Sequence, residues 1–323
     1  MCWGIILLSL AYSQTHTAES FGFRHLHWKY QNDPVEILIQ SQKGEENIPK
    51  PILFFCQGSL PKPLLIYQGK EVYGTFPFQT DRILEQYHLV IVGKPYIPVL
   101  TDVNSLRADF SYTDTTGEFP KDYTNRNLLH YYVPRNLGVI RYLRKQSWVS
   151  RKQLVVAGHS EGSTIAAKMA SESHEITHLI YSGGNPMGRI VSIITQSRVN
   201  ETDTDSTRFG ENNLQYWAQV IQNQTDISNR TMFEFSEPMY PVLLKLNIPV
   251  LVTYGTKDWC SPYLDFLRVE ILRKKKQNIT FFPYIGTEHN YFPVKKDNTP
   301  DYETFNWDKV ANDWLKWLKL QPK

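Results

Sequence analysis

Short apolar segments recur along this 323-residue chain, and most of them end at glycine, proline or another turn-forming residue. Residues 35–40 (VEILIQ) alternate apolar and polar positions, as expected of a strand with one buried face. The other segments are continuous apolar runs, which are typical of strands buried on both faces of a parallel sheet. These runs predict strands at residues 51–55, 89–93, 154–157, 177–181, 250–254 and 279–284.

Helical patterns separate the predicted strands. Residues 127–145 and 307–320 carry apolar side chains about one helical turn apart, and residues 163–171 are rich in alanine. Because strands and helices alternate along the chain, and because the strands have the composition of buried ones, we predict an α/β fold. Its central sheet should be mostly parallel, with helices on both faces.

One long segment interrupts this alternation. Residues 191–247 contain no buried strand run but include an acidic cluster and scattered aromatic residues. The segment is too long for an ordinary connection, so we interpret it as a mainly helical cap inserted before the last strands. The core would then comprise residues 20–190 and 248–323, and a long disordered loop is the alternative. The aromatic residues of such a cap would favour a partly apolar substrate.

The N-terminal residues form an apolar stretch of a different kind. Residues 3–12 (WGIILLSLAY) are uncharged and too few to cross a bilayer as a helix. Ala11 and Ser13 supply the small residues of a cleavage site before Gln14. We therefore expect residues 1–13 to be a signal peptide, although no basic residue precedes the apolar run, and a buried strand or helix is the alternative. The mature chain would be secreted or periplasmic, without a transmembrane helix.

The composition excludes several functional classes. A hydrophobic content of 41% and an aromatic content of 13% are typical of a folded protein with a large core. The 35 basic and 32 acidic residues are mixed along the chain, so we expect no nucleic-acid partner. The three cysteines form no CxxC pair and no Cys/His cluster at ligand spacing, which argues against a structural zinc site. The composition leaves the oligomeric state open.

A serine stands between a strand-like and a helix-like run in residues 154–163 (LVVAGHSEGS). The five residues GHSEG, from Gly158 to Gly162, match G-x-S-x-G, in which a strained turn lifts the serine hydroxyl clear of a sheet. Glycine is needed on each side of the serine because larger side chains would clash with neighbouring elements. We predict that Ser160 is a nucleophile and that Gly158 and Gly162 are the glycines of this elbow.

A serine hydroxyl is a weak nucleophile without a base, and the base needs an acid partner. His289 follows the last predicted strand, in a loop that can return over Ser160. Asp258 is the acidic residue nearest the end of the preceding strand at residues 250–254. The sequence therefore predicts a catalytic triad of Ser160, His289 and Asp258, with the neighbouring Glu288 as the competing acid.

The oxyanion of an acyl-transfer reaction needs two backbone N–H donors. Glu161 should supply one of them, at the start of the helix that follows the nucleophile. Ser59 should supply the other from the loop after residues 51–55, with Gly58 allowing a close approach. The alternative is that this loop is only a turn that ends the strand.

The order Ser160, Asp258, His289 resembles that of the α/β-hydrolase family, and the resemblance extends from about residue 35 to the last helix. The GHSEG elbow is similar to those of bacterial esterase and serine-peptidase-like members. Family members often carry His-Gly in the oxyanion loop, where this chain has Gln57-Gly58. The resemblance implies hydrolysis through an acyl-enzyme on the serine, without a metal or cofactor.

These expectations favour one function over two others. The leading hypothesis is a secreted or periplasmic serine esterase that hydrolyses a small-molecule carboxylic ester. One alternative is a serine peptidase acting on short peptides, and another is a non-catalytic binding protein with the same fold. Cys56 and Cys260 both follow predicted strands near the catalytic edge, and the sequence leaves open whether they form a disulfide.

Overall fold

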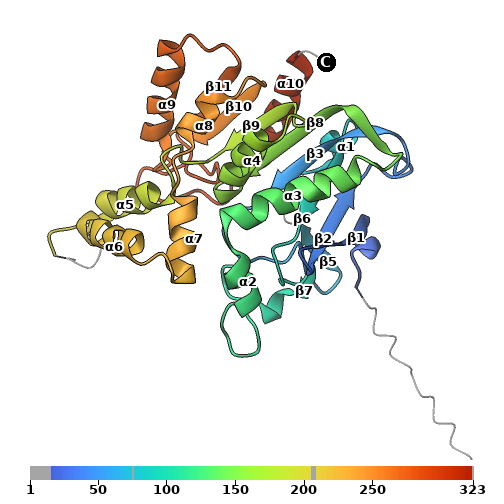
Figure 1. Cartoon of the computed structure of the whole chain (residues 1–323), viewed down its shortest axis with the longest axis horizontal. Helices are drawn as coiled ribbons and strands as arrows, with labels where there is room; N and C mark the ends of the chain where they lie inside the picture. Colours follow the sequence, from blue (N-terminus) through green and yellow to red (C-terminus); the bar gives the residue numbers. More distant parts are fainter. Residues whose placement is uncertain (1–15, 75, 205–208, 322–323) are drawn as a thin grey trace, which may run out of the picture.

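A twisted sheet forms the centre of the computed structural model, which describes residues 16–74, 76–204 and 209–321 (Figure 1). Its eight strands lie in the order β1-β2-β6-β3-β8-β9-β10-β11. The first three pair antiparallel and the remaining neighbours pair parallel. The strands are β1 (Phe23–Tyr30), β2 (Asp33–Gln40), β3 (Lys50–Cys56), β6 (His88–Val92), β8 (Val149–His159), β9 (His178–Ser182), β10 (Val250–Gly255) and β11 (Ile279–Tyr284).

Alternate residues of the central strands enter two separate apolar cores, one on each side of the sheet. In β8, Leu154 and Val156 face one core, whereas Val155 and Ala157 face the other. The continuous apolar runs of the sequence are therefore explained by burial on both faces.

Helices cover both faces of the sheet. Apolar side chains of α3 (Leu129–Leu143), α4 (Glu161–Glu172), α8 (Tyr240–Lys245) and α9 (Ser261–Arg273) line the first core. Those of α1 (Asp81–Leu84) and α10 (Trp307–Leu320) line the second core. The predicted α/β class, with a mostly parallel sheet covered on both faces, is confirmed.

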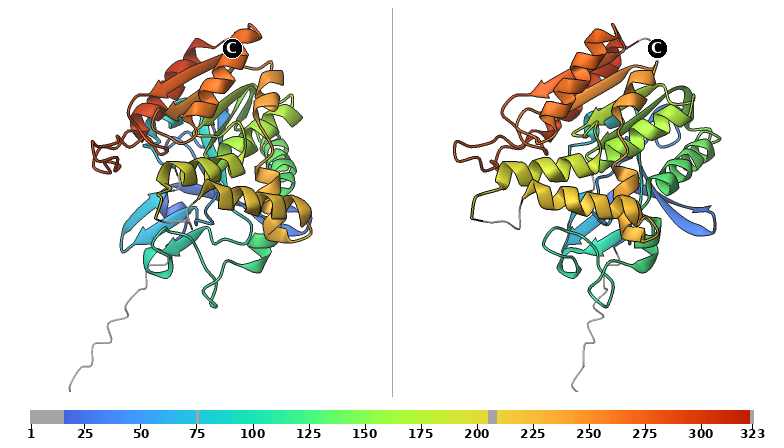
Figure 2. Two further views of the ribbon diagram at one scale, coloured as in Figure 1. Left: turned by 90° about the vertical axis from the view of Figure 1, so that its left-hand side faces the viewer. Right: turned by 60° about the vertical axis from the view of Figure 1, so that its left-hand side comes forward.

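The segment expected to form a cap is helical in the described residues. It contains α5 (Arg189–Asn200), α6 (Gly210–Gln222) and α7 (Ile227–Phe235), followed by α8. Helices α5 and α6 lie side by side and project beyond the sheet (Figures 1 and 2). Helix α8 packs on the core through Leu243, and α7 reaches the same core through Phe235 at its last residue, so α5 and α6 are the helices that project furthest.

Several elements were not predicted from the sequence. One face of strand β1 packs against the core through Leu26, Trp28 and Tyr30. Polar and charged residues occupy the intervening positions, so the strand has no continuous apolar run. A second sheet has the order β5-β4-β7 and consists of short strands, β4 (Leu65–Gln68), β5 (Glu71–Gly74) and β7 (Leu100–Asp102). The remaining helices are α2 (Lys121–Arg126) and the single 3-10 turns η1 (Glu19–Phe21) and η2 (Val103–Ser105).

The expected signal peptide, residues 1–13, lies outside the described residues. Across the described part of the chain, no helix has both the length and the apolar character needed to cross a membrane.

The packing of α10 generates a prediction about stability. Trp314 is fully buried, and its ring contacts Phe78 and Trp307 at centroid distances of 5.6 and 6.2 Å. Trp314→Ala should lower the free energy of unfolding by about 3–5 kcal/mol, because it leaves a cavity in the core. Urea denaturation followed by far-ultraviolet circular dichroism measures this loss. Leu320→Ala, at an 83% exposed position of the same helix, is the control and should have little effect. Equal losses in the two variants would contradict the packing argument.

Candidate active site

Ser160 occupies the turn between β8 and α4. Its backbone has φ 57° and ψ −127°, a conformation that residues other than glycine rarely adopt. The strand ends at His159 and the helix begins at Glu161, so the whole change of direction falls on the serine. This is the strained strand-to-helix turn of a nucleophile elbow.

The two elbow glycines are required by close backbone contacts. A Cβ at Gly158 would lie 2.0 Å from the carbonyl oxygen of Gly162. A Cβ at Gly162 would lie 2.0 Å from the carbonyl oxygen of Cys56 at the end of β3. Real Cβ atoms essentially never approach so closely, so any larger residue would push β8, α4 and β3 apart.

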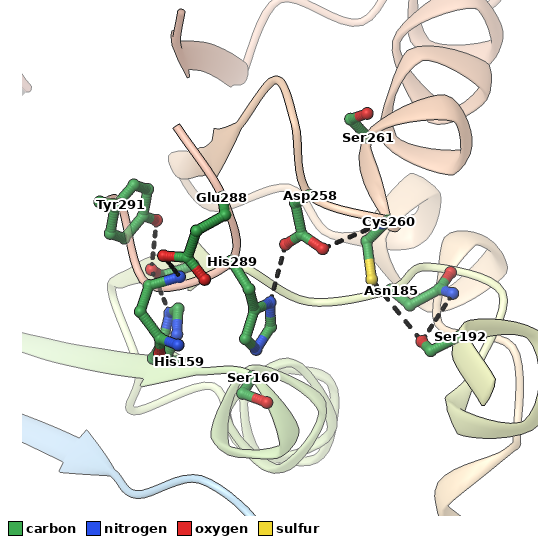
Figure 3. A network of polar contacts seen from close by, with 12 residues as sticks. His159, Ser160, Asn185, Ser192, Asp258, Cys260, Ser261, Glu288, His289 and Tyr291 are labelled. Carbon is green, nitrogen blue, oxygen red and sulfur yellow. Dashed lines mark hydrogen bonds and ion pairs between the residues drawn. The ribbon is translucent and has the colours of Figure 1, made fainter. Parts of the chain in front are cut away.

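The structure brings His289 and Asp258 together. His289 Nδ1 lies 2.7 Å from Asp258 Oδ2, and the aspartate side chain is fully buried. Asp258 Oδ1 accepts a second hydrogen bond, from the N–H of Cys260, at 3.0 Å. Figure 3 shows the imidazole between this carboxylate and Ser160. The carboxylate therefore orients the ring and leaves its Nε2 side toward the serine.

Ser160 and His289 lie beside each other without a direct hydrogen bond among the described residues (Figure 3). A nucleophile and its base often align fully only when substrate is bound. In this structure the hydrogen bond to Asp258 holds His289 in place, and Ser160 lies next to the imidazole.

The competing acid, Glu288, has a different role in the structure. Its Oε1 accepts hydrogen bonds from the N–H groups of Asn290 and Phe292, at 2.7 and 3.0 Å. Glu288 thus shapes the loop that carries His289, whereas Asp258 contacts the imidazole.

The charge environment favours the protonated form of His289. Burial by itself lowers the pKa of this imidazole, but the hydrogen bond and negative charge of Asp258, helped by the charge of Glu288, outweigh burial and leave the pKa raised. An imidazole that takes up a proton next to the serine would therefore be stabilised.

His159 lies against the candidate base without being a second base. Its ring centroid is 4.9 Å from that of His289, and its Nδ1 is 3.0 Å from Ser182 Oγ. Burial, and next the charge of His289, hold the pKa of His159 well below its usual range. Ser182 in turn contacts the Tyr291 hydroxyl at 2.6 Å. His159 is therefore a neutral, hydrogen-bonded histidine that packs beside the candidate base His289 (Figure 3).

Ser59 and Glu161, whose N–H groups are the predicted oxyanion donors, both border the cavity of Ser160. Glu161 is the first residue of α4, where N–H groups point out of the helix end. Ser59 borders the same cavity as Ser160. A Cβ at the neighbouring Gly58 would lie 3.8 Å from Ser160 Cβ, an ordinary contact. The loop after β3 therefore runs past Ser160, but the space around Gly58 would also accept a larger residue.

A buried ion cluster surrounds the Glu161 side chain, and it was not anticipated from the sequence. Lys94 Nζ lies 3.1 Å from Glu161 Oε1, and both side chains are about 97–98% buried, with exposures of 2% and 3%. Arg189, the first residue of α5, pairs with the other carboxylate oxygen. Burial lowers the pKa of Arg189 to about 10, so the guanidinium stays charged at neutral pH. The ion pair between Arg189 and Glu161 thus connects α5 with the turn at Ser160.

Two cavities meet at Ser160. The larger one, of about 360 Å³, extends toward α5 and has Arg189, Ser192, Gln196, Phe235 and Trp259 among its lining residues. The second, of about 260 Å³, extends toward Leu60, Lys62 and Trp307. Ser59, Ser160 and His289 border both cavities. The two cavities therefore extend in different directions from Ser160.

The two described cysteines do not pair. Both are free and buried. Cys56 Sγ lies 3.9 Å from Met169 Sδ, and Cys260 Sγ lies 3.6 Å from Ser192 Oγ. The disulfide that the sequence left open is therefore absent from the described residues.

The sequence matches the model of one protein family over a stretch that contains the candidate site. The family described as BAAT / Acyl-CoA thioester hydrolase C terminal matches residues 138–299, just over half of the chain. This stretch includes Ser160, Asp258 and His289. No curated protein matches the sequence.

Solved structures share the fold at low sequence identity. Acylaminoacyl peptidase from Pyrococcus horikoshii matches 92% of this chain with 13% identity and a TM-score of 0.54, although the chain spans only 40% of that protein. Est1E from Butyrivibrio proteoclasticus matches 91% of this chain with 14% identity and a TM-score of 0.51, over 97% of its own length. The α/β-hydrolase fold implied by the motif resemblance is thus confirmed.

The raised pKa of His289 generates a prediction about pH. Because the folded-state pKa lies above the ordinary value of 6.5, the stabilisation from the charged pair is fully present below that value. It is lost as the pH rises through the folded-state pKa. Asp258→Asn should lower the pKa of His289, as measured by a nuclear magnetic resonance titration of the ring. The gap in unfolding free energy between wild type and variant should widen as the pH falls. An unchanged His289 pKa in the variant would contradict the assigned pairing.

Proposed function

Because this chain belongs to the BAAT / acyl-CoA thioester hydrolase C-terminal family, we propose that it is a serine hydrolase that cleaves acyl esters through an acyl-enzyme on Ser160. The observation that carries the proposal is the oriented His289–Asp258 pair beside a serine held in a strained turn. This combination supports the assignment of Ser160 as nucleophile, His289 as base and Asp258 as the acid partner in acyl transfer.

The first half of the reaction forms a bond between Ser160 Oγ and the substrate carbonyl carbon. His289 Nε2 accepts the hydroxyl proton as this bond forms, and Asp258 stabilises the resulting imidazolium. The N–H groups of Ser59 and Glu161 hold the negative charge that develops on the carbonyl oxygen. The bond to the leaving group then breaks, and His289 returns its proton to that group.

The second half of the reaction releases the acyl group. Water enters the space vacated by the leaving group, and His289 removes one of its protons while the oxygen attacks the acyl-enzyme. The ester bond to Ser160 then breaks and the serine oxygen regains a proton from His289. The products are a carboxylic acid and the free enzyme.

We assign the acyl or alcohol specificity to the larger cavity, under a cap formed by α5, α6 and α7. Phe235 and Trp259 give its lining some aromatic surface, but Arg189, Ser192 and Gln196 make much of the remainder polar. The Arg189 guanidinium lies 4.6 Å from the centre of the Phe235 ring, which holds it in place beside Glu161. Short acyl groups with a polar part fit this lining better than long alkyl chains do.

The family description favours a thioester as the second substrate class. Thioesters and oxygen esters react through the same acyl-enzyme, and they differ in the leaving group, a thiol in place of an alcohol. The peptide alternative requires protonation of a much poorer amine leaving group by His289.

The first test of the proposal is loss of the nucleophile. Hydrolysis of p-nitrophenyl butyrate should fall at least about a thousandfold in Ser160→Ala, because the acyl-enzyme cannot form. Ser171→Ala, near the other end of α4, is the matched control and should keep wild-type activity. A fluorophosphonate probe should label wild type and Ser171→Ala but not Ser160→Ala. Equal hydrolysis in all three proteins would remove Ser160 from the reaction. If wild type shows no hydrolysis and no labelling, the result would favour the non-catalytic binding protein.

The second test concerns the substrate. Three substrates with the same acyl group, butyryl, are compared by their kcat/KM: an oxygen ester, an N-acetylcysteamine thioester and an anilide. We expect both esters to exceed the anilide, and p-nitrophenyl acetate and butyrate to exceed the palmitate, because a cavity of about 360 Å³ cannot enclose a long chain. Faster cleavage of the anilide would favour the peptidase alternative. A preference for palmitate would contradict the enclosure of the acyl group in either cavity.

A further inference from the structure

A group of three potential metal ligands lies on the β1–β2 hairpin, apart from the cavities around Ser160. His25 and His27 are two residues apart on β1, so their side chains lie on the same face of the strand. Glu36 on β2 stands directly opposite His27 in the antiparallel register. The hairpin forms the edge of the sheet, at the opposite end of the strand order from β11.

Both imidazoles converge on one carboxylate oxygen. His25 Nε2 lies 2.6 Å and His27 Nδ1 lies 2.7 Å from Glu36 Oε2, and the two ring centroids are 4.3 Å apart. The three ligand atoms all lie within 4.8 Å of one another. Two imidazole nitrogens and a carboxylate oxygen are a common donor set for zinc and related transition metals. A small outward movement of the three side chains would place an ion between them.

The backbone beneath this group is firmly held. Leu26 and Trp28, which alternate with the two histidines, pack their side chains against the core on the other face of β1. The carbonyl oxygen of Glu36 accepts a 2.8 Å hydrogen bond from the N–H of Gly93 at the end of β6. The ligands therefore project from a fixed scaffold, which lowers the ordering cost of binding an ion.

An ion could reach this group from solvent. The side chains of His25, Glu36 and His27 are 18%, 27% and 73% exposed. Glu19 interacts electrostatically with His25 and adds negative charge beside the group. Water can complete the coordination on the open side.

We propose that His25, His27 and Glu36 form a binding site for a divalent transition-metal ion such as Zn²⁺. The ion cross-links β1 and β2 at the edge of the sheet. No cysteine-containing zinc pattern marks this site in the sequence, and Glu36 joins the two histidines only through the strand register. The proposal is independent of the proposed hydrolase activity.

The test uses protein without a histidine tag, stripped of metal with a chelator. Isothermal titration with Zn²⁺ should show one site per chain in wild type. His25→Ala and His27→Ala should each raise the dissociation constant at least tenfold, while His174→Ala, an exposed histidine elsewhere, should leave it unchanged. Ca²⁺ should not bind measurably, because imidazole is a poor ligand for this ion. Zn²⁺ should also raise the melting temperature of wild type more than that of His27→Ala.

Glu36→Gln separates a metal site from a simple hydrogen-bonded clamp. Glutamine keeps the length of the side chain and can accept a hydrogen bond, but it lacks the negative charge that favours a metal ion. We expect this variant to fold normally and to bind Zn²⁺ at least tenfold more weakly. Titration of Co²⁺ in wild type should give a visible absorption band that is lost in His25→Ala. Absence of Zn²⁺ binding in wild type, or equal affinity in wild type and the two alanine variants, would overturn the proposal.

Discussion

The close approach of three backbone segments at the elbow is the constraint on which the rest of the site depends. β8, α4 and the end of β3 come so near that neither Gly158 nor Gly162 has room for a Cβ. This contact forces the change of direction onto Ser160, whose positive φ is the local cost. It also places the start of α4 and the loop after β3 on two sides of the same serine, where backbone N–H groups can face one carbonyl oxygen.

The parallel sheet brings the other two members of the proposed triad to that point. β8, β9, β10 and β11 are neighbours, so the loops that leave their carboxyl ends meet along one edge. Asp258 and His289 belong to two of these loops and are joined by a hydrogen bond. Further hydrogen bonds hold the loops themselves. The Asp258 carboxylate accepts one from the N–H of Cys260, and the Glu288 carboxylate accepts one from the N–H of Asn290. The sheet thus supplies proximity, and local hydrogen bonds supply orientation.

Charge links the elbow to the projecting helices. Glu161 contributes its N–H to the proposed oxyanion site, and its side chain is buried between Lys94 and Arg189. Removing one partner from such a buried group would leave an uncompensated charge. Arg189 opens α5, so any movement of α5 to α7 relative to the sheet would disturb a contact to the residue beside the nucleophile. The proposed substrate cavity and the proposed catalytic residues are therefore connected by one charged contact, between Arg189 and Glu161.

Local patterns in the sequence were enough to predict the elements whose residues repeat a simple rule. Continuous apolar runs identified the buried strands, and G-x-S-x-G between a strand and a helix identified Ser160. The order of the chain singled out Asp258 and His289, which the fold then placed side by side. Tertiary structure alone decided the rest, because Lys94, Arg189 and the histidines of β1 carry no local pattern. Their neighbours come from distant segments, and only the strand register and the path of the long connections bring those charges together.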